Sequence, residues 1–314
     1  MHNSSTHTIH HQHHHWVWSN ELEPVYTARP GETVQFTTME SSGGQIGPMS
    51  TAADAAALDF SRVNPVTGPV VVEGAEPGDV LKLRIEETTA CGWGWTAIIP
   101  NFGLLPEHFP EPALRLWSYD SGSSKSVAWG DIARIPLKPM IGSIGLAPEA
   151  PGEHDILPPR RVGGTMDIRD LGAGAVLYLP VEAQGGLLSV GDTHAAQGDG
   201  EVCGTGLESA IDVAVTIELI KNTPLKFPRL EVFSPVTDHL DAAGYEVTTG
   251  IGPDLFRCAK ESVMAMVDLI AREHRVSPED AYMLCSLCGD LRISEIVDRP
   301  HGVVSFYFPR IVFE

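Results

Sequence analysis

Short apolar or alternating runs dominate the first 220 residues of the chain. Residues 80–86 (VLKLRIE) alternate with period two, and residues 68–73 (GPVVVE) form an apolar run; both patterns are typical of β-strands. The 24 prolines and 31 glycines lie mostly between such runs, where they favour turns. We predict further strands over residues 33–38, 125–127, 133–136, 175–180, 187–190 and 212–219.

The pattern becomes helical after Phe227. Apolar residues recur at three- and four-residue spacing over 253–274, which predicts a helix. Ser277 and Pro278 then supply an N-cap and a first-turn proline for a second helix that runs to about Cys288. Residues 302–312 are predicted to form a closing strand.

These patterns predict a mainly β fold with an α+β C-terminal region. The body is expected to be a β-sandwich or barrel, followed by helices and the closing strand. Residues 1–14 are interpreted as a disordered arm, because the first 15 residues hold seven of the 13 histidines. Residues 15–225 then form the β-rich catalytic body, and residues 226–314 form the α+β region.

Composition narrows the function and the location. The 41 acidic residues outnumber 21 lysines and arginines, and the net charge of −20 argues against a nucleic-acid partner. No run approaches the ~18 apolar residues of a membrane helix, and no signal segment opens the chain, so we expect a cytoplasmic protein without a membrane partner.

Five cysteines, an odd number, fit reduced thiols rather than a set of disulfides. Cys285 and Cys288 form a CxxC in an apolar helical segment, where buried core thiols are expected rather than a redox pair.

The densest group of chemically active residues lies in residues 181–212. Among the seven glycines of this stretch lie Asp192, His194, Asp199, Glu201 and Glu208. Glycine lets a backbone fold tightly and lets a substrate approach it. Crowded acids repel one another unless a cation or a proton lies among them. The stretch therefore predicts a site.

A metal-assisted site explains this group best. Asp192 and His194 lie two apart, which places both side chains on one face of a strand. With Asp167 they form a candidate trio of metal ligands, because an open zinc site takes three protein ligands. Glu201 or Glu208 is then available for proton transfer. In the alternative reading, Asp192 caps a turn, His194 bonds a carbonyl and Glu208 is an ordinary surface residue.

Several strings together resemble the acetamidase/formamidase family of amide hydrolases. The strings are residues 68–79 (GPVVVEGAEPGD), 138–148 (KPMIGSIGLAP), 163–167 (GGTMD), 179–181 (LPV) and 190–208 (VGDTHAAQGDGEVCGTGLE). The resemblance implies hydrolysis of a small linear amide to a carboxylic acid and ammonia. It also implies a β-rich body with an α+β region, a divalent metal (zinc, with calcium as the alternative) and assembly into a homo-oligomer.

The resemblance also suggests residues that bind substrate. Glu40 stands where the family tends to have aspartate, and with Gln45 it is expected to line the cleft. Trp95 is a candidate wall residue, with a place in the core as the alternative. The family's His-Gly-Gly-Asn-x-Asp motif appears here with Val162 and Thr165 in place of histidine and asparagine. Thr165 is therefore a position where specificity is expected to differ.

Two other hypotheses remain beside metal-assisted hydrolysis. A divergent, non-enzymatic protein that binds a metal or small ligand is favoured by the altered motif. A cysteine nucleophile at Cys203, as in amidases that use Cys, Glu and Lys, is less favoured because no lysine lies near it in sequence.

Overall fold

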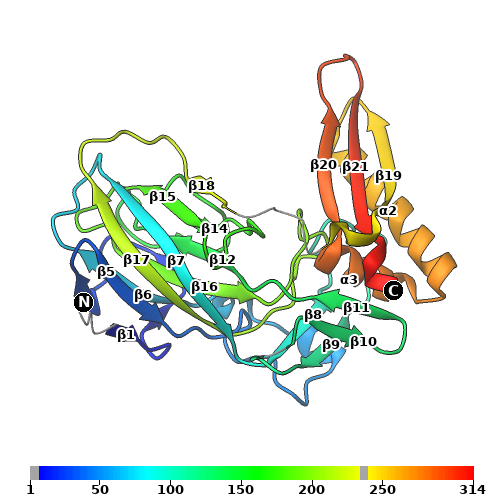
Figure 1. Ribbon diagram of the computed structural model, residues 1–314, viewed down its shortest axis with the longest axis horizontal. Coiled ribbons are helices and arrows are strands. Elements are labelled where there is room, and N and C mark those ends of the chain that lie inside the picture. Colours follow the sequence, from blue (N-terminus) through cyan, green and yellow to red (C-terminus); the bar gives the residue numbers. More distant parts are fainter. Residues whose placement is uncertain (1–6, 123, 234–239) are drawn as a thin grey trace.

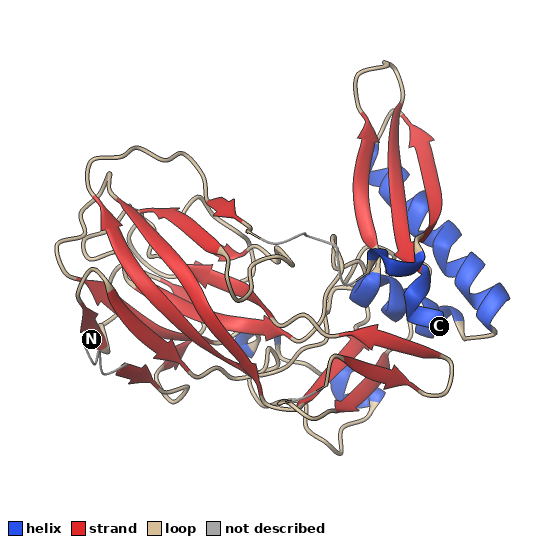
Figure 2. Cartoon of the chain, viewed as in Figure 1, coloured by secondary structure: helices blue, strands red, loops and turns tan. Residues whose placement is uncertain are grey.

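A computed structural model describes residues 7–122, 124–233 and 240–314. Two six-stranded sheets form the larger part of the molecule (Figures 1 and 2). In the first sheet the strand order is β1(His7–Ile9), β5(Glu32–Phe36), β17(Ile211–Ile220), β7(Val80–Ala90), β15(Val176–Pro180) and β18(Arg229–Glu231). In the second it is β14(Gly163–Thr165), β12(Met140–Gly145), β16(Leu188–His194), β6(Val66–Val72) and β2(His14–His15), with β4(Tyr26–Ala28) paired to β6.

The two sheets pack through one apolar core, to which Val34 and Leu83 of the first sheet and Ile144 and Val190 of the second contribute. This arrangement confirms the predicted β-rich body and is the sandwich of the two predicted alternatives, a sandwich or a barrel. Burial explains why β12 was missed: every residue of Met140–Gly145 is buried, so the strand shows no alternation.

A second core joins the C-terminal region to smaller sheets. The three-stranded sheet β19(Tyr245–Gly252), β21(Gly302–Pro309) and β20(Asp290–Glu295) packs on α2(Leu255–His274), which contacts α3(Pro278–Cys288). The same core includes Trp117 and Trp129, from the hairpins β8(Trp93–Ile98)–β9(Ala113–Ser118) and β10(Ser126–Trp129)–β11(Ala133–Pro136). The predicted division between the β-rich body and the α+β region, near residue 225, stays a prediction. The second core contains residues from both sides of that division. The remaining elements are α1(Ala52–Ala56), η1(Phe60–Arg62), η2(Asp241–Ala243), η3(Arg310–Phe313) and the pair β3(Val17–Trp18)–β13(His154–Asp155).

Both predicted helices are confirmed, and so is the predicted N-cap of the second. The Ser277 hydroxyl accepts a hydrogen bond from the Asp280 amide at 3.0 Å, and Pro278 opens α3. Asp254 caps α2 by accepting bonds from the amides of Phe256 and Arg257. No helix in the described part of the chain is long and apolar enough to span a membrane.

The expectation of a disordered arm over residues 1–14 is wrong where the structure describes it. His7–Ile9 forms β1, which runs parallel to β5, and the buried Ile9 joins the sandwich core. The His7 ring also stacks on Tyr26, with ring centroids 3.9 Å apart. Residues 1–6 lie outside the described residues.

The glycine-rich stretch 181–212 connects the two cores. It leaves the second sheet at the end of β16, enters the second core at Ala195 and Cys203, and returns to the first sheet at β17. Main-chain bonds hold it against the C-terminal unit: the Gly198 amide donates to the Ser286 carbonyl at 2.8 Å. The chemically active residues therefore lie between the sandwich and the helices.

Candidate active site

Asp192 and His194 lie on one strand, β16, as their spacing predicted. Both side chains are buried, and His194 Nε2 lies 3.3 Å from Asp192 Oδ1. Glu208 reaches the same nitrogen from the other end of the loop, with Oε2 at 3.0 Å. Main-chain bonds position Glu208 against β8, because its N–H and C=O pair with those of Trp95 at 2.8 and 2.9 Å. Glu208 is thus buried, and the alternative interpretation of it as an ordinary surface residue is wrong.

Gln197 sets the tautomer of His194. Its side-chain amide donates to the main-chain carbonyl of Asp167 at 2.7 Å, which turns its oxygen toward His194 Nδ1, also at 2.7 Å. Nδ1 therefore carries a proton, and Nε2 turns its lone pair toward two carboxylates. That contact is repulsive unless a cation or a second proton lies between the atoms.

Two buried oxygens in the site have no hydrogen-bond partner. They are Asp167 Oδ1 and Glu208 Oε2; the latter lies near His194 Nε2 without the alignment of a hydrogen bond. The other Glu208 oxygen accepts from the Gly206 amide at 2.7 Å. Buried, unpaired carboxylate oxygens are rare and need an explanation. A bound cation or a proton would satisfy each of them.

Electrostatics also call for positive charge in this group. Burial and the nearby Asp192 raise the pKa of Asp167 to about 7. Burial, with Asp167 close by, raises the pKa of Glu201 well above its usual range. Burial lowers the pKa of His194, but Glu208 and Asp192 outweigh it, so the net shift is strongly upward. With no metal present, protons would take the cation's place.

The five predicted groups form two overlapping sets of potential ligands. Asp192, His194 and Glu208 make one set, and Asp167, His194 and Glu201 make the other. Around a tetrahedral zinc, nitrogen and oxygen ligands at ~2.0–2.1 Å lie about 3.3 Å apart. The two contacts of His194 Nε2, at 3.0 and 3.3 Å, have that spacing. The first set therefore fits a zinc ion, and Gln197 makes the outer hydrogen bond that such a histidine needs.

The main chain at the site adopts an unusual conformation. Eight non-glycine residues in the described part of the chain have positive φ, and four of them line one cavity. These are Asn64 at 49°, Asp167 at 49°, Asp192 at 47° and Glu201 at 42°. Left-handed backbone costs energy outside glycine and gathers where function requires an exact side-chain direction. Three of the predicted acids are held in this way.

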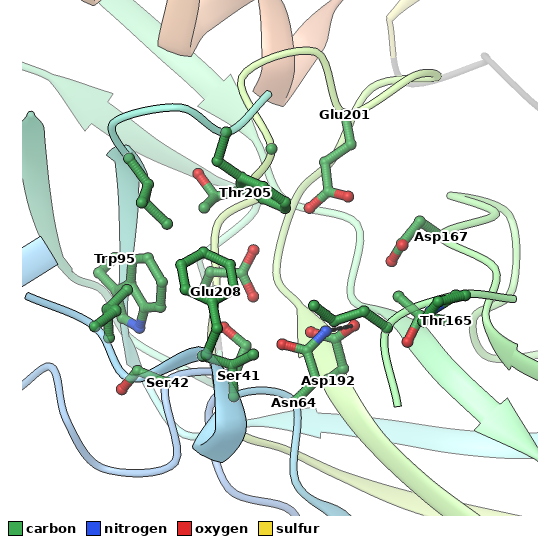
Figure 3. Close-up of a pocket in the computed structure, with 18 of the residues that line it drawn as sticks. Ser41, Ser42, Asn64, Trp95, Thr165, Asp167, Asp192, Glu201, Thr205 and Glu208 are labelled. Atoms are coloured by element: carbon green, nitrogen blue, oxygen red, sulfur yellow. Dashed lines mark hydrogen bonds between the residues drawn. The ribbon is translucent and has the colours of Figure 1, made fainter. Parts of the chain in front are cut away.

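The cavity beside these residues has a volume of about 360 Å³. Figure 3 shows Asp167, Asp192 and Glu201 on one side, Trp95 on the other and Glu208 between them. Thr165 also lines the cavity, and its hydroxyl lies 2.5 Å from Ser143 Oγ, which donates to Asp192 Oδ2 at 3.1 Å. The predicted residues thus converge on one cavity from four segments of the chain. They are Trp95, Thr165, Asp167, Asp192, Glu201 and Glu208.

Glu40 and Gln45 do not line the cavity, contrary to expectation. The Glu40 carboxylate accepts four hydrogen bonds, from the Ser42 amide and hydroxyl, the Gly44 amide and Trp95 Nε1, at 2.7–2.9 Å. Gln45 bonds the main chain at Ser42 and Asp59. The hydrogen-bonding groups of the Glu40 and Gln45 side chains are therefore used within the protein, mainly to hold the loop over residues 40–62. Neither side chain has a group free to bind a substrate. Glu40 acts on the cavity indirectly, by holding Ser42 and Trp95, which line it.

The thiols do not support a cysteine nucleophile. Cys203 is buried in the second core, and burial raises the pKa of its thiol. It is not a lining residue, and no lysine is among the described residues that line the cavity. Cys285 and Cys288 are buried, unpaired thiols in α3, which confirms their structural interpretation.

Sequence reasoning missed two supporting residues, Gln197 and Asn64. Gln197 follows His194 by three positions, a spacing that was a usable signal within the glycine-rich stretch. Asn64 donates to Asp192 Oδ2 at 2.8 Å from 128 residues away, so nothing local marked it.

Replacing Gln197 with leucine is expected to weaken metal binding by about 10–100-fold, because the His194 tautomer loses its anchor. The measurement is competition for zinc with a chromogenic chelator. Gln197→Glu keeps an acceptor for Nδ1–H and should recover much of the affinity. Equal affinity in wild type and Gln197→Leu would remove Gln197 from the site.

Comparisons with known proteins agree with this geometry. The family model described as the Acetamidase/Formamidase family matches residues 2–155 and 150–314. A formamidase from Methylophilus methylotrophus is 25% identical, covering 95% of this chain and 88% of its own. A γ-lactamase structure from Delftia acidovorans has a TM-score of 0.89 at 25% identity, covering 96% of this chain and 90% of its own. An acetamidase structure from Bacillus halodurans has a TM-score of 0.68 at 31% identity, covering 96% and 97%.

Proposed function

The chain belongs to the acetamidase/formamidase family, and we propose that it is a metal-dependent hydrolase of linear amides. The products are a carboxylic acid and ammonia. The observation that carries the proposal is the group of four acids around His194, with two buried carboxylate oxygens that have no partner. Such a group is stable only with a cation or extra protons inside it.

Asp192, His194 and Glu208 are proposed to hold the ion, with zinc favoured by the nitrogen and the ligand spacing. The sequence suggested Asp167 as a ligand and Glu201 or Glu208 for proton transfer; the 3.0 Å contact of Glu208 with His194 Nε2 favours Glu208 as the ligand in place of Asp167. Zinc, when bound, supplies a Lewis acid that makes water nucleophilic near neutral pH and polarises a carbonyl. Calcium fits less well, because it prefers six to eight oxygen ligands.

Asp167 and Glu201 are proposed to move the protons. Burial and the nearby Asp192 raise the pKa of Asp167 to about 7, where its carboxylate can still accept a proton from the attacking water. Burial raises the pKa of Glu201 well above its usual range, which favours the protonated carboxyl group, and that group is available to donate a proton to the departing nitrogen. The new C–O bond forms as the water gives its proton to Asp167; the C–N bond then breaks as the nitrogen takes the proton from Glu201, and ammonia leaves.

Other residues hold this arrangement in place. Asn64 and Ser143 both bond Asp192 Oδ2, which leaves Oδ1 facing His194 Nε2. Thr165 continues that chain through its hydroxyl and lies where the substrate amide would enter. A residue fixed at both oxygens cannot rotate away, so the charge is preorganised for the reaction.

The direct test is ammonia release from formamide and acetamide before and after removal of metal with dipicolinate. We expect turnover to fall to background and to return when zinc is added, with the circular dichroism spectrum unchanged throughout. Full turnover by protein shown to be metal-free would contradict the metal role and leave only side-chain catalysis.

A non-enzymatic binding protein on this scaffold is the second candidate, and Thr165 in place of asparagine favours it. Val162, the other departure, is a core residue with 2% exposure and leaves the cavity unaltered. Thr165→Asn separates the two cases: activity that appears only in this variant would identify the natural protein as a binder.

The assembly and the location are proposals from the family resemblance and from composition. We propose a homo-oligomer in the cytoplasm, and light scattering of the purified protein tests the first point. A monomer at micromolar concentration would contradict it.

A further inference from the structure

The cavity is larger than formamide or acetamide requires. These amides have three and four non-hydrogen atoms, and a water-sized group occupies ~30 Å³, so they need roughly 100 Å³. The cavity volume is about 360 Å³. That value lies at the lower end of pockets that hold much larger ligands. Most of the space therefore lies beyond the atoms that react.

The additional space has apolar walls. Its lining includes six large apolar side chains: Leu58, Phe60, Val63, Ile99, Phe102 and Leu157. They come from three segments far apart in sequence. Phe60 and Phe102 meet edge to face with centroids 5.4 Å apart, and Phe60 keeps 40% of its surface exposed. A ligand that covers these side chains removes apolar surface from water, which is favourable.

One side of the cavity is charged, and an aromatic ring forms part of the opposite wall. The acids Asp167, Asp192 and Glu201 lie opposite Trp95 in Figure 3, and the Trp95 N–H already bonds Glu40. Trp95 thus presents its ring to the cavity and offers no free donor. A ligand that satisfies both ends carries one polar group and one apolar group.

We propose, building on the amide hydrolysis proposed above, that the preferred substrate is an amide with an extended apolar acyl group. The space beyond the amide accommodates about five to eight non-hydrogen atoms. The amide faces the acids, and the hydrocarbon chain or ring lies between Phe60, Phe102 and Leu157. Formamide and acetamide fill only the polar end.

The first test is a series of primary amides from acetamide through butyramide to hexanamide, with phenylacetamide as a ring. We expect kcat/KM to rise about fourfold per added methylene, which corresponds to ~0.8 kcal/mol. Over the four methylenes from acetamide to hexanamide, the rise is on the order of a hundredfold. A kcat/KM that stays level or falls beyond acetamide would overturn the inference while leaving amide hydrolysis intact.

The second test shortens the walls. Phe60→Ala and Phe102→Ala should each lower the ratio of kcat/KM for hexanamide to that for acetamide by about tenfold or more. Phe256→Ala is the matched control, because Phe256 is 64% exposed at the start of α2 and does not line the cavity. Its ratio should equal that of wild type. An equal ratio in all three variants would contradict the role of the two cavity phenylalanines.

Binding separates failure of this inference from failure of the enzyme proposal. Calorimetry on Glu201→Gln, which keeps the side-chain shape, should show hexanamide binding at least tenfold more tightly than acetamide. Tight hexanamide binding with no turnover of any amide by wild type would reject catalysis and keep the apolar subsite. Equal affinity for the two amides would reject the subsite, whatever the turnover.

Discussion

Replacing Glu208 with glutamine is expected to remove tight metal binding and to lower kcat for amide hydrolysis by on the order of 10³. The glutamine keeps the oxygen that accepts the Gly206 amide bond. Its NH2 group replaces Oε2, the atom 3.0 Å from His194 Nε2. An amide nitrogen cannot ligate a cation there, but it can donate to the histidine lone pair. Losing a group at the reacting centre has effects of this size.

The same variant should remain folded and be at least as stable as wild type without metal. It removes one of several acids that repel each other in a buried space. Thermal unfolding of the metal-free proteins, with zinc content measured in parallel, gives both readouts. A stable Glu208→Gln protein that still binds zinc tightly would show that the ion, if bound, does not use Glu208.

Glu40→Gln is the matched control, since it makes the same change in a neighbouring buried acid. Its carboxylate accepts four hydrogen bonds, and an amide NH2 would face donors instead. Leaving such donors unpaired costs about 1–3 kcal/mol. We therefore expect a lower unfolding temperature with unchanged zinc content, the opposite of the result at Glu208.

Replacing Gly142 with alanine is expected to disrupt the site through shape alone. A Cβ at this position in β12 would lie 2.5 Å from Asp167 Oδ1, 2.6 Å from the Asp192 carbonyl oxygen and 3.0 Å from Asp192 Oδ2. Two of these atoms belong to carboxylates and one to the central strand β16, which cannot move freely. We expect a loss of about 1–3 kcal/mol in stability and at least a hundredfold loss in kcat/KM from displacement of the acids.

Gly47→Ala controls for the change itself, because a Cβ there meets nothing within 4 Å. Its unfolding temperature and activity should match wild type. Wild-type zinc affinity and turnover in a well-folded Gly142→Ala protein would contradict the placement of Asp167 and Asp192 against β12.

The features that the sequence predicted correctly depend on interactions within a few residues. The Asp192–His194 spacing placed two groups on one strand face, and Ser277–Pro278 marked the start of α3, because both signals act within a few residues. The same reasoning failed at His7–Ile9. There the composition suggested disorder, but pairing with β5 and burial of Ile9 stabilise a strand.

Contacts between distant segments explain what was missed. Glu40 was expected in the cleft, but its four donors include Trp95, which lies 55 residues away. Asn64 and the wall residue Phe60 reach the site only through the fold. The positive φ angles of Asp167, Asp192 and Glu201 are also invisible in sequence, since aspartate and glutamate carry no signal of the kind that glycine does.

Anomalous X-ray scattering from crystals of zinc-loaded protein, recorded on both sides of the zinc absorption edge, shows whether the His194 group holds the ion. We expect a peak about 2.0–2.2 Å from His194 Nε2 and from one oxygen each of Asp192 and Glu208. Zinc found only at the histidines of the first 15 residues, with the His194 group bridged by protons or water, would contradict this expectation.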